Sequence, residues 1–324
     1  MRRIGLLALA IALGTAYGQA PKKYTTPKTP WGDPDLQGIF PGTAMIGVPM
    51  QRPENFGTRN VLTEEEFKAR AEQAKRQSDA DSEEYLKPGT VAGINPPSYW
   101  IERGKPNYQA SLVVDPPDGR IPPLTPEADQ KAKDRAAAQR LRNTPRSWED
   151  MTYYDRCISR GVLGSILPVI YNNGNQIIQA PGYVVIRYEM IHEARIIPLD
   201  GRPHAGAGVK TFLGDARGHF EGDTLVVDTT NFLGDKNGIG LNGNGTPHSD
   251  QLHLTERFKR TDSDTIQYSA TIDDPKTWTK PWTLSFPLKA EKGYELFEYA
   301  CHEGNYAMAD ILSGARIEEK SAKR

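Results

Sequence analysis

Cysteine is scarce in this chain of 324 residues, which contains only Cys157 and Cys301. Neither cysteine has another close to it in sequence, so the paired spacing of a thiolate zinc site is missing. No run after the N-terminal residues is apolar enough to span a bilayer. The formal net charge is −1, and no basic stretch of the kind that holds nucleic acid stands out. We therefore expect neither a membrane span nor a nucleic-acid partner.

The sequence also lacks the common motifs of nucleophilic and nucleotide chemistry. It contains no G-x-S-x-G or S-x-x-K nucleophile, no phosphate-binding G-x-x-x-x-G-K and no H-E-x-x-H zinc motif. Histidine is absent from the first half, because all six histidines lie at or after His192. Acid–base chemistry that uses imidazole is therefore expected in the second half of the chain.

Residues 1–18 have the pattern of a secretory signal peptide. Two arginines precede an apolar run that ends at Leu13, and small residues flank Tyr17. This pattern predicts cleavage of the signal and a periplasmic or extracellular location. Export to an oxidising compartment favours a disulfide between Cys157 and Cys301, and two separate buried thiols are the alternative.

Residues 19–150 combine a proline-rich segment with two helices. The prolines between residues 19 and 59 exclude a continuous helix and remove hydrogen-bond donors from any strand. Thr63 and Glu66 have the spacing of a capping box, which predicts that one helix begins there. Thr125 followed by Pro126 predicts the start of the other. We expect this part to form an extended arm with two peripheral helices that wrap the core.

Residues 151–324 are expected to form an antiparallel β domain that carries the functional site. From residue 176 onward, alternating segments such as TLVVDTTNF and TIQYSATID are separated by turn residues. About seven or eight such segments predict a mostly β fold. We favour an up-and-down, lipocalin-like barrel, with a sandwich as the alternative. The last predicted strands are WTLSFPL and YELFEYACHEGNY, and the glycine-rich loop 237–247 is a candidate lid.

Several stretches resemble a family of secreted bacterial proteins that is common in Acidobacteria. The matching motifs are TPWGDPDLQG, VDPPDGRIPPLTPEA, RC at Arg156 and Cys157, YEMIHEARIIPLDGRPH, GHFEGDTLVVDTTNF, YACHEGNY and ILSGAR. The resemblance covers most of the chain, and it implies secretion and a single folded unit. It implies no mechanism, so the chemistry has to be inferred from the residues.

Strand alternation places several ionisable side chains on apolar faces. His192 continues the apolar row that begins at Val184, Glu256 lies on the apolar face of LHLTERF, and Glu298 and His302 continue one face of YELFEYACHE. Buried ionisable groups cost free energy unless they are paired, so several on one interior indicate a site. We predict that His192, Glu256, Glu298 and His302 form a catalytic group for acid–base chemistry.

Two alternatives to this catalytic group stay open. The opposite face of the last predicted strand, which carries Tyr299 and Cys301, is equally apolar, and choosing it would turn Glu298 and His302 outward. The carboxylates would otherwise form salt bridges with Arg187, Arg195 or Arg257 inside an ordinary core.

Four further residues are predicted to bind a substrate. Arg202 and His204 follow an Asp-Gly turn, from which they could reach a pocket mouth and hold an anionic group or a developing oxyanion. Tyr188 and Tyr299 would add hydrogen-bond donors. The alternative for Arg202 and His204 is a plain surface turn.

No cofactor is predicted, although a divalent metal is a second possibility. His192, His204 and His302 would be the ligands of a three-histidine site. Adjacent residues of a strand point to opposite faces, which argues against using the neighbouring glutamates as further ligands.

These patterns favour a secreted enzyme, a hydrolase or lyase, that uses His and Glu for hydrolysis, elimination or isomerisation of a small organic substrate. The alternatives are a secreted ligand-binding protein without turnover, a metal-dependent hydrolase or oxidoreductase, and a structural envelope protein. The sequence indicates neither the substrate nor the oligomeric state.

Overall fold

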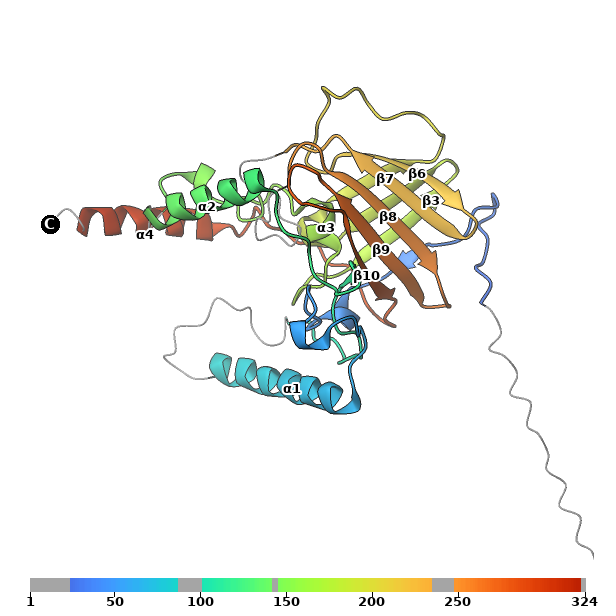
Figure 1. Ribbon diagram of the computed structural model, residues 1–324, viewed down its shortest axis with the longest axis horizontal. Helices are drawn as coiled ribbons and strands as arrows, with labels where there is room; N and C mark the ends of the chain where they lie inside the picture. The colour runs from blue at the N-terminus through green and yellow to red at the C-terminus, as the bar shows by residue number, and fades with distance from the viewer. Residues whose placement is uncertain (1–23, 87–100, 142–144, 235–247, 322–324) are drawn as a thin grey trace, which may run out of the picture.

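The computed structural model describes residues 24–86, 101–141, 145–234 and 248–321 (Figure 1). The predicted signal peptide 1–18 and the predicted lid 237–247 lie outside these ranges. Two antiparallel sheets dominate the fold, which confirms the mostly β class. The four-stranded sheet contains, in spatial order, β1 (Gly38–Ile39), β3 (Asn175–Ala180), β4 (Tyr183–Tyr188) and β5 (Ala194–Pro198). The six-stranded sheet contains β2 (Val113–Asp115), β10 (Trp282–Lys289), β9 (Thr265–Asp273), β8 (His253–Arg260), β7 (Thr224–Thr230) and β6 (Asp215–Glu221).

Each sheet buries one face, because apolar and polar residues alternate along its strands. β4 buries Val184, Ile186 and Tyr188, and its other positions are more exposed. β8 and β9 bury Phe258 and Tyr268 in the same phase as Glu256, so the predicted phases of these strands are confirmed. Inward residues of both sheets belong to one hydrophobic cluster.

The predicted hairpin between the strands on either side of Glu221-Gly222-Asp223 is confirmed. Glu221 pairs with Thr224, which leaves Gly222 and Asp223 as the loop. Gly222 has φ +59°, a backbone conformation that L side chains rarely adopt. A tight turn of this kind fixes the register of β6 against β7.

The barrel favoured from the sequence is not formed. Among the described residues, no strand of the four-stranded sheet is hydrogen-bonded to a strand of the six-stranded sheet. Closure requires an unbroken ladder around the barrel, and the chain between β5 and β6 at residues 199–214 makes no strand that would supply it. The two-sheet arrangement agrees with the sandwich alternative.

The proline-rich first half contributes to both sheets. β1 pairs with β3, and β2 pairs with β10. Its side chains also enter the hydrophobic cluster, where Leu36, Phe40 and Met45 are almost fully buried. The arm is therefore integral to the core and not only a covering.

The two helices predicted in the first half are confirmed as α1 (Glu64–Leu86) and α2 (Pro126–Leu141). At α1, Thr63 Oγ1 accepts from the Glu66 backbone N–H at 3.3 Å, and the Thr63 backbone N–H donates to Glu66 Oε2 at 2.8 Å. This is the predicted capping box. At α2, Thr125 Oγ1 accepts from the Ala128 backbone N–H at 3.2 Å. A third, short helix, α3 (Gly161–Ile166), is fully buried.

The prediction of a last strand was wrong, because residues 290–305 are irregular. Their backbone groups bond to side chains instead of a neighbouring strand: the Phe297 N–H donates to Glu189 Oε1 at 2.9 Å, and the Tyr299 carbonyl lies 3.0 Å from His192 Nδ1. A helix that was not predicted, α4 (Tyr306–Ser321), follows and projects away from the sheets (Figure 1).

In the described part of the chain, every helix is too short or too polar to cross a membrane.

Candidate functional site

Glu256 lies in the interior between the sheets, where it is paired with an arginine. Arg195 on β5 bonds to both oxygens of the carboxylate, with Nη2–Oε2 at 2.6 Å and Nη1–Oε1 at 3.1 Å. The two side chains are 3% and 0% exposed. Tyr268 donates to Glu256 Oε1 at 3.0 Å, and Arg195 Nη1 donates to the Tyr188 hydroxyl at 3.0 Å. Glu256 thus has the arginine partner of the structural alternative, and no histidine bonds to it.

Burial and the ion pair with Glu256 shift the pKa values of the side chains around this contact. Burial alone would lower the pKa of Arg195, but the Glu256 carboxylate raises it above its usual value. Burial raises the pKa of Tyr188 to about 12. The two sheets are therefore joined by a buried, hydrogen-bonded ion pair. Tyr188 takes part in this contact and not in a substrate-binding surface.

His192 does not extend the apolar row of β4. The strand ends at Tyr188, and Ile191 and His192 have φ values of +57° and +45°. This left-handed backbone breaks the two-residue alternation, so His192 is exposed. Glu298 and His302 are also exposed, on the irregular segment before α4. The expected group of His192, Glu256, Glu298 and His302 is therefore not assembled.

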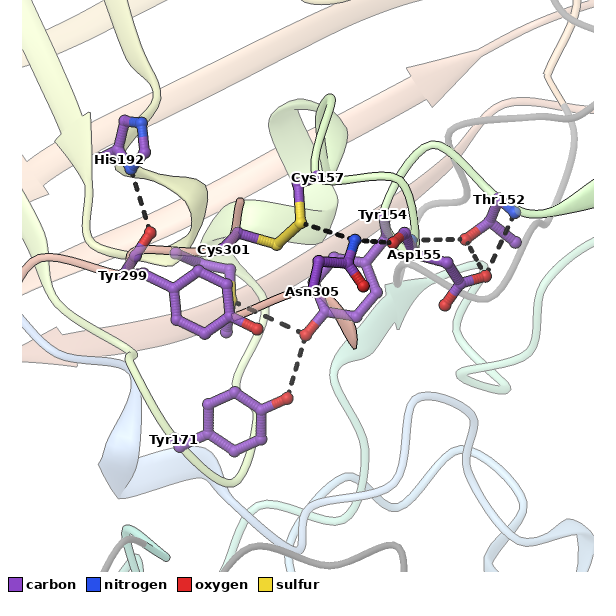
Figure 2. The surroundings of a disulfide bond; sticks show 10 residues. Thr152, Tyr154, Asp155, Cys157, Tyr171, His192, Tyr299, Cys301 and Asn305 are labelled. Carbon is purple, nitrogen blue, oxygen red and sulfur yellow. Dashed lines mark hydrogen bonds between the residues drawn. A yellow bond between two sulfur atoms is a disulfide. The ribbon is translucent and has the colours of Figure 1, made fainter. Parts of the chain in front are cut away.

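His192 and Tyr299 instead lie beside the disulfide (Figure 2). Cys157 and Cys301 are bonded across 144 residues of sequence, with their Cα atoms 5.6 Å apart. Asn305 Nδ2 donates to the Asp155 carbonyl at 2.9 Å and lies 3.3 Å from Cys157 Sγ. The disulfide thus joins the segment before α3 to the segment before α4.

A group of tyrosines lies next to this disulfide (Figure 2). The hydroxyls of Tyr154 and Tyr171 are 3.0 Å apart, and the rings of Tyr171 and Tyr299 are nearly parallel with centroids 6.3 Å apart. Burial raises the pKa of each of these three phenols, that of Tyr171 to about 12. They remain protonated at neutral pH and can donate hydrogen bonds.

The most extended group of partly exposed titratable side chains in the described residues is centred on Asp228. We call it the Asp228 cluster, and it contains His204, Asp215, Arg217, Asp228 and His253. Asp228 Oδ1 lies 2.8 Å from His204 Nε2, and Oδ2 lies 2.5 Å from His253 Nε2. His204 Nδ1 is also 3.2 Å from Asp215 Oδ2. One carboxylate therefore bridges two imidazoles.

Strand register brings this cluster together. Asp215, Asp228 and His253 belong to the adjacent strands β6, β7 and β8, at positions whose neighbours are buried on the inner face. Because side chains alternate, the three point to the outer face of the six-stranded sheet. Asp228 is paired with Thr255, so His253, two residues earlier on β8, is a diagonal neighbour of Asp228.

His204 comes from the loop between β5 and β6, which is fixed against the end of β7. Asn231 Nδ2 donates to the carbonyls of Ala205 and Val209, both at 3.0 Å. The Ala205 N–H donates to Asp215 Oδ2 at 2.8 Å. These contacts hold the loop so that the imidazole of His204 reaches Asp228.

Hydrogen bonds and charges within the Asp228 cluster shift the pKa values of its members. Bonds from His253 and His204 hold the pKa of Asp228 below its usual range. Burial would raise the pKa of Asp215, but the Ala205 N–H and the Arg217 guanidinium hold it below its usual range. The bond to Asp228 raises the pKa of His253. The Asp228 carboxylate is therefore ionised at neutral pH and orients both imidazoles.

The cluster is accessible to solvent. The side chains of His204, Asp228 and His253 are 27%, 35% and 43% exposed. Within the described residues, no group bonds to His253 Nδ1. His253 thus has one nitrogen held by a carboxylate and the other open to solvent or to a bound molecule.

Arg202 does not take part in this cluster. It forms an exposed ion pair with Asp200 on the same turn, and that pairing lowers the pKa of Asp200. This is the surface-turn alternative for Arg202, whereas His204, two residues later, does enter a group of titratable residues.

Sequence reasoning missed Asp228 and His253 because it considered only inward-facing groups. Asp228 follows the apolar residues of TLVVDTTNF, and His253 occupies the polar phase of LHLTERF. The available signal was two ionisable residues on outward positions of neighbouring strands. It could not be recognised without the register of β7 against β8.

The alternative three-histidine metal site is not assembled. His204 bonds to Asp215 and Asp228, His192 lies against the Tyr299 carbonyl, and His302 is exposed in a turn. Over the described ranges, no group of three or more His, Cys, Asp or Glu side chains is arranged to hold a metal ion. In comparisons with known proteins, no family model, no curated protein and no solved structure matches this chain, so only its own geometry bears on its function.

Proposed function

We propose that the protein is an enzyme that uses the Asp228 cluster for general acid–base chemistry on a small organic molecule. His253 is the proton-transfer group, Asp228 is its positioning residue, and His204 is the second imidazole on the same carboxylate. The observation that carries this proposal is the double contact of Asp228 with both Nε2 atoms, together with the open Nδ1 of His253.

This arrangement has the chemical properties that proton transfer requires. A carboxylate that accepts from Nε2–H fixes the tautomer in which Nδ1 is unprotonated. That nitrogen can then take a proton from water or from a carbon acid, and the carboxylate stabilises the imidazolium that results. Hydrolysis and elimination both use such a step, so the proposed class is hydrolase or lyase.

The outer face is the proposed location because the interior is filled. We propose a sandwich in which Arg195, Glu256, Tyr188 and Tyr268 occupy the space between the sheets. A lipocalin-like site would need an open interior instead. A substrate would therefore bind over β7 and β8, beside the loop that carries His204.

We also propose that the protein is exported to the periplasm or the extracellular space. The pattern of residues 1–18 supports this, and so does the disulfide between Cys157 and Cys301, because structural disulfides persist in oxidising compartments.

A model ester tests the proton-transfer role. We expect the wild-type chain to hydrolyse p-nitrophenyl acetate about 10²-fold or more faster than His253→Gln, since a positioned acid–base group contributes at least this much. His219→Gln is the matched control, because His219 is an exposed histidine on the same sheet whose Nε2 lies 3.3 Å from Glu221 Oε1. Equal rates for wild type and His253→Gln, both folded by circular dichroism, would refute the proposal.

The pH dependence gives a second test. A general base acts in its neutral form, so the rate should rise as pH passes through the pKa of His253, which Asp228 raises above the usual value of about 6.5. In Asp228→Asn the carboxylate is lost, so the inflection should move to lower pH and the rate should fall. NMR titration of the His253 ring protons measures the same shift without a substrate. An unchanged His253 titration in Asp228→Asn would contradict the positioning role.

A further inference from the structure

Arg160 is a buried arginine, and two nitrogens of its guanidinium group have no hydrogen-bond partner among the described residues. It lies between the disulfide residue Cys157 and the start of α3, and it is 7% exposed. Its guanidinium carbon lies over the ring of Tyr154, 4.7 Å from the centroid. Within the described residues, its Nε and Nη1 are buried and have no hydrogen-bond partner.

Other buried arginines in this chain have hydrogen-bond partners for their terminal nitrogens. In Arg52 and Arg195 only Nε is buried without a partner, and terminal nitrogens donate to a carbonyl or a carboxylate. An unpaired buried charge is costly, so native proteins usually satisfy it. Arg160 therefore differs from these arginines, because one of its terminal nitrogens is buried without a hydrogen-bond partner.

No nearby carboxylate neutralises the guanidinium. Glu193 Oε2 accepts from the Arg160 backbone N–H at 3.3 Å, which places it on the main chain and not on the side chain. Burial raises the pKa of Glu193. Across the described ranges, Arg160 forms no ion pair.

This positive charge lies against one member of a group of three tyrosines. The hydroxyls of Tyr154 and Tyr171 are 3.0 Å apart, and Tyr299 stacks on Tyr171 (Figure 2). Tyr154 contacts the guanidinium directly, with its ring centroid 4.7 Å from the guanidinium carbon. Burial raises the pKa of all three tyrosines and outweighs the opposing effect of the Arg160 charge. The three tyrosines are half-buried, so each keeps part of its surface in contact with solvent.

We propose that Arg160 anchors a binding site for a small aromatic carboxylate, with Tyr154, Tyr171 and Tyr299 as its walls and donors. A planar guanidinium matches a carboxylate in charge and geometry. Phenol rings match an aromatic ring, and their protonated hydroxyls donate to the anion. This site shares no residue with the Asp228 cluster and does not depend on the function proposed for it.

The test uses the full mature chain with its disulfide intact, and benzoate as the probe. We expect benzoate to raise the melting temperature saturably and to change the tyrosine absorbance, whereas neutral benzamide at the same concentration does neither. In Arg160→Gln the affinity for benzoate should fall at least about tenfold, because a charged partner is lost. Arg156→Gln is the matched control, since Arg156 also lies over aromatic rings in the same segment, 4.4 Å from the centroid of Trp148 and 5.1 Å from that of Tyr153.

The stability of the ligand-free variant separates binding from a structural role. If Arg160 serves a ligand, Arg160→Gln should melt at the same temperature as wild type or higher, because a costly unpaired charge is removed. If Arg160 serves only to pack on Tyr154, the variant should melt lower and benzoate should act on it as on wild type, which overturns the proposal. If Arg160→Gln does not fold, Tyr171→Phe removes one hydroxyl, and undiminished benzoate binding by that variant overturns the proposal. Absence of saturable benzoate binding to wild type overturns it as well.

Discussion

At the scale of single residues, strand alternation predicts which side chains point inward but not which of them meet. The phase of β8 correctly placed Glu256 on the inner face, where it is 0% exposed. Its partner Arg195 lies on β5 of the other sheet, and a contact between sheets depends on how they pack. Alternation also failed at His192, because the left-handed backbone at Ile191 and His192 has no simple signal in the residue types.

The buried ion pair leads to a stability prediction. Glu256→Gln should lower the free energy of unfolding by about 3–5 kcal/mol, because the charge of Arg195 stays buried without its counter-ion. Urea denaturation at neutral pH measures this. Glu221→Gln is the control: the Glu221 carboxylate is half-exposed and lies 2.6 Å from Arg257, so solvent screens this ion pair and its loss should cost far less than the loss of Glu256.

Replacing both partners gives the complementary result. The double variant Arg195→Met with Glu256→Leu should recover most of the stability lost in Glu256→Gln, because apolar groups of similar size need no counter-ion. If Glu256→Gln is as stable as Glu221→Gln, the pair does not hold the two sheets together.

At the scale of elements, the capping boxes and tight turns were predictable, and the irregular C-terminal segment was not. Thr63 with Glu66 and the turn at Gly222 are local signals, and both appear where the sequence places them. Residues 290–305 alternate like a strand, but their backbone bonds to Glu189 and His192 from distant segments. The helix α4 was missed although Met308, Leu312 and Ala315 have the spacing of one helical face, on which Ala315 is buried and the other two are half-buried.

The disulfide is expected to hold this C-terminal segment in place. Replacing Cys157 and Cys301 together by serine should lower the free energy of unfolding by about 2–5 kcal/mol, because the bond closes a long loop. Limited proteolysis with mass spectrometry should then show new cleavage between residues 290 and 321 before the sheets are cut. Identical cleavage patterns for oxidised wild type and the serine variant would show that other contacts, such as Tyr294 to Glu189 at 2.7 Å, suffice.

At the scale of the whole molecule, the sequence predicted the β class but not how the two halves combine. Alternating segments and turns were enough to identify most strands of the second half. The short β1 gave no such signal, because it contains only two residues, whereas SLVVD predicted the strand that forms β2. Their pairing with β3 and β10 depends on residues far away in sequence, which local patterns cannot show.

Because the first half contributes strands and core residues, a chain without it should associate with other chains. A protein that begins at residue 151 lacks β1, β2 and the buried Leu36, Phe40 and Met45, so β3 and β10 become unpaired edges. Exposed edges pair with other chains, and we expect this protein to form large oligomers in size-exclusion chromatography with light scattering. Adding residues 24–150 as a separate chain should restore the size of the full-length protein. A shortened chain that folds and elutes like the full-length protein would contradict this expectation.

The pairing of β2 with β10 also affects when the sheet can form during synthesis of the chain. Asp115 is synthesised in the first half of the chain, but its ladder partner Thr283 emerges near the end. The six-stranded sheet cannot be completed until β10 has been made, whereas every strand of the four-stranded sheet is present once the chain reaches Pro198. Contacts of such long range slow folding, so we expect the six-stranded sheet to form last, when synthesis is almost finished.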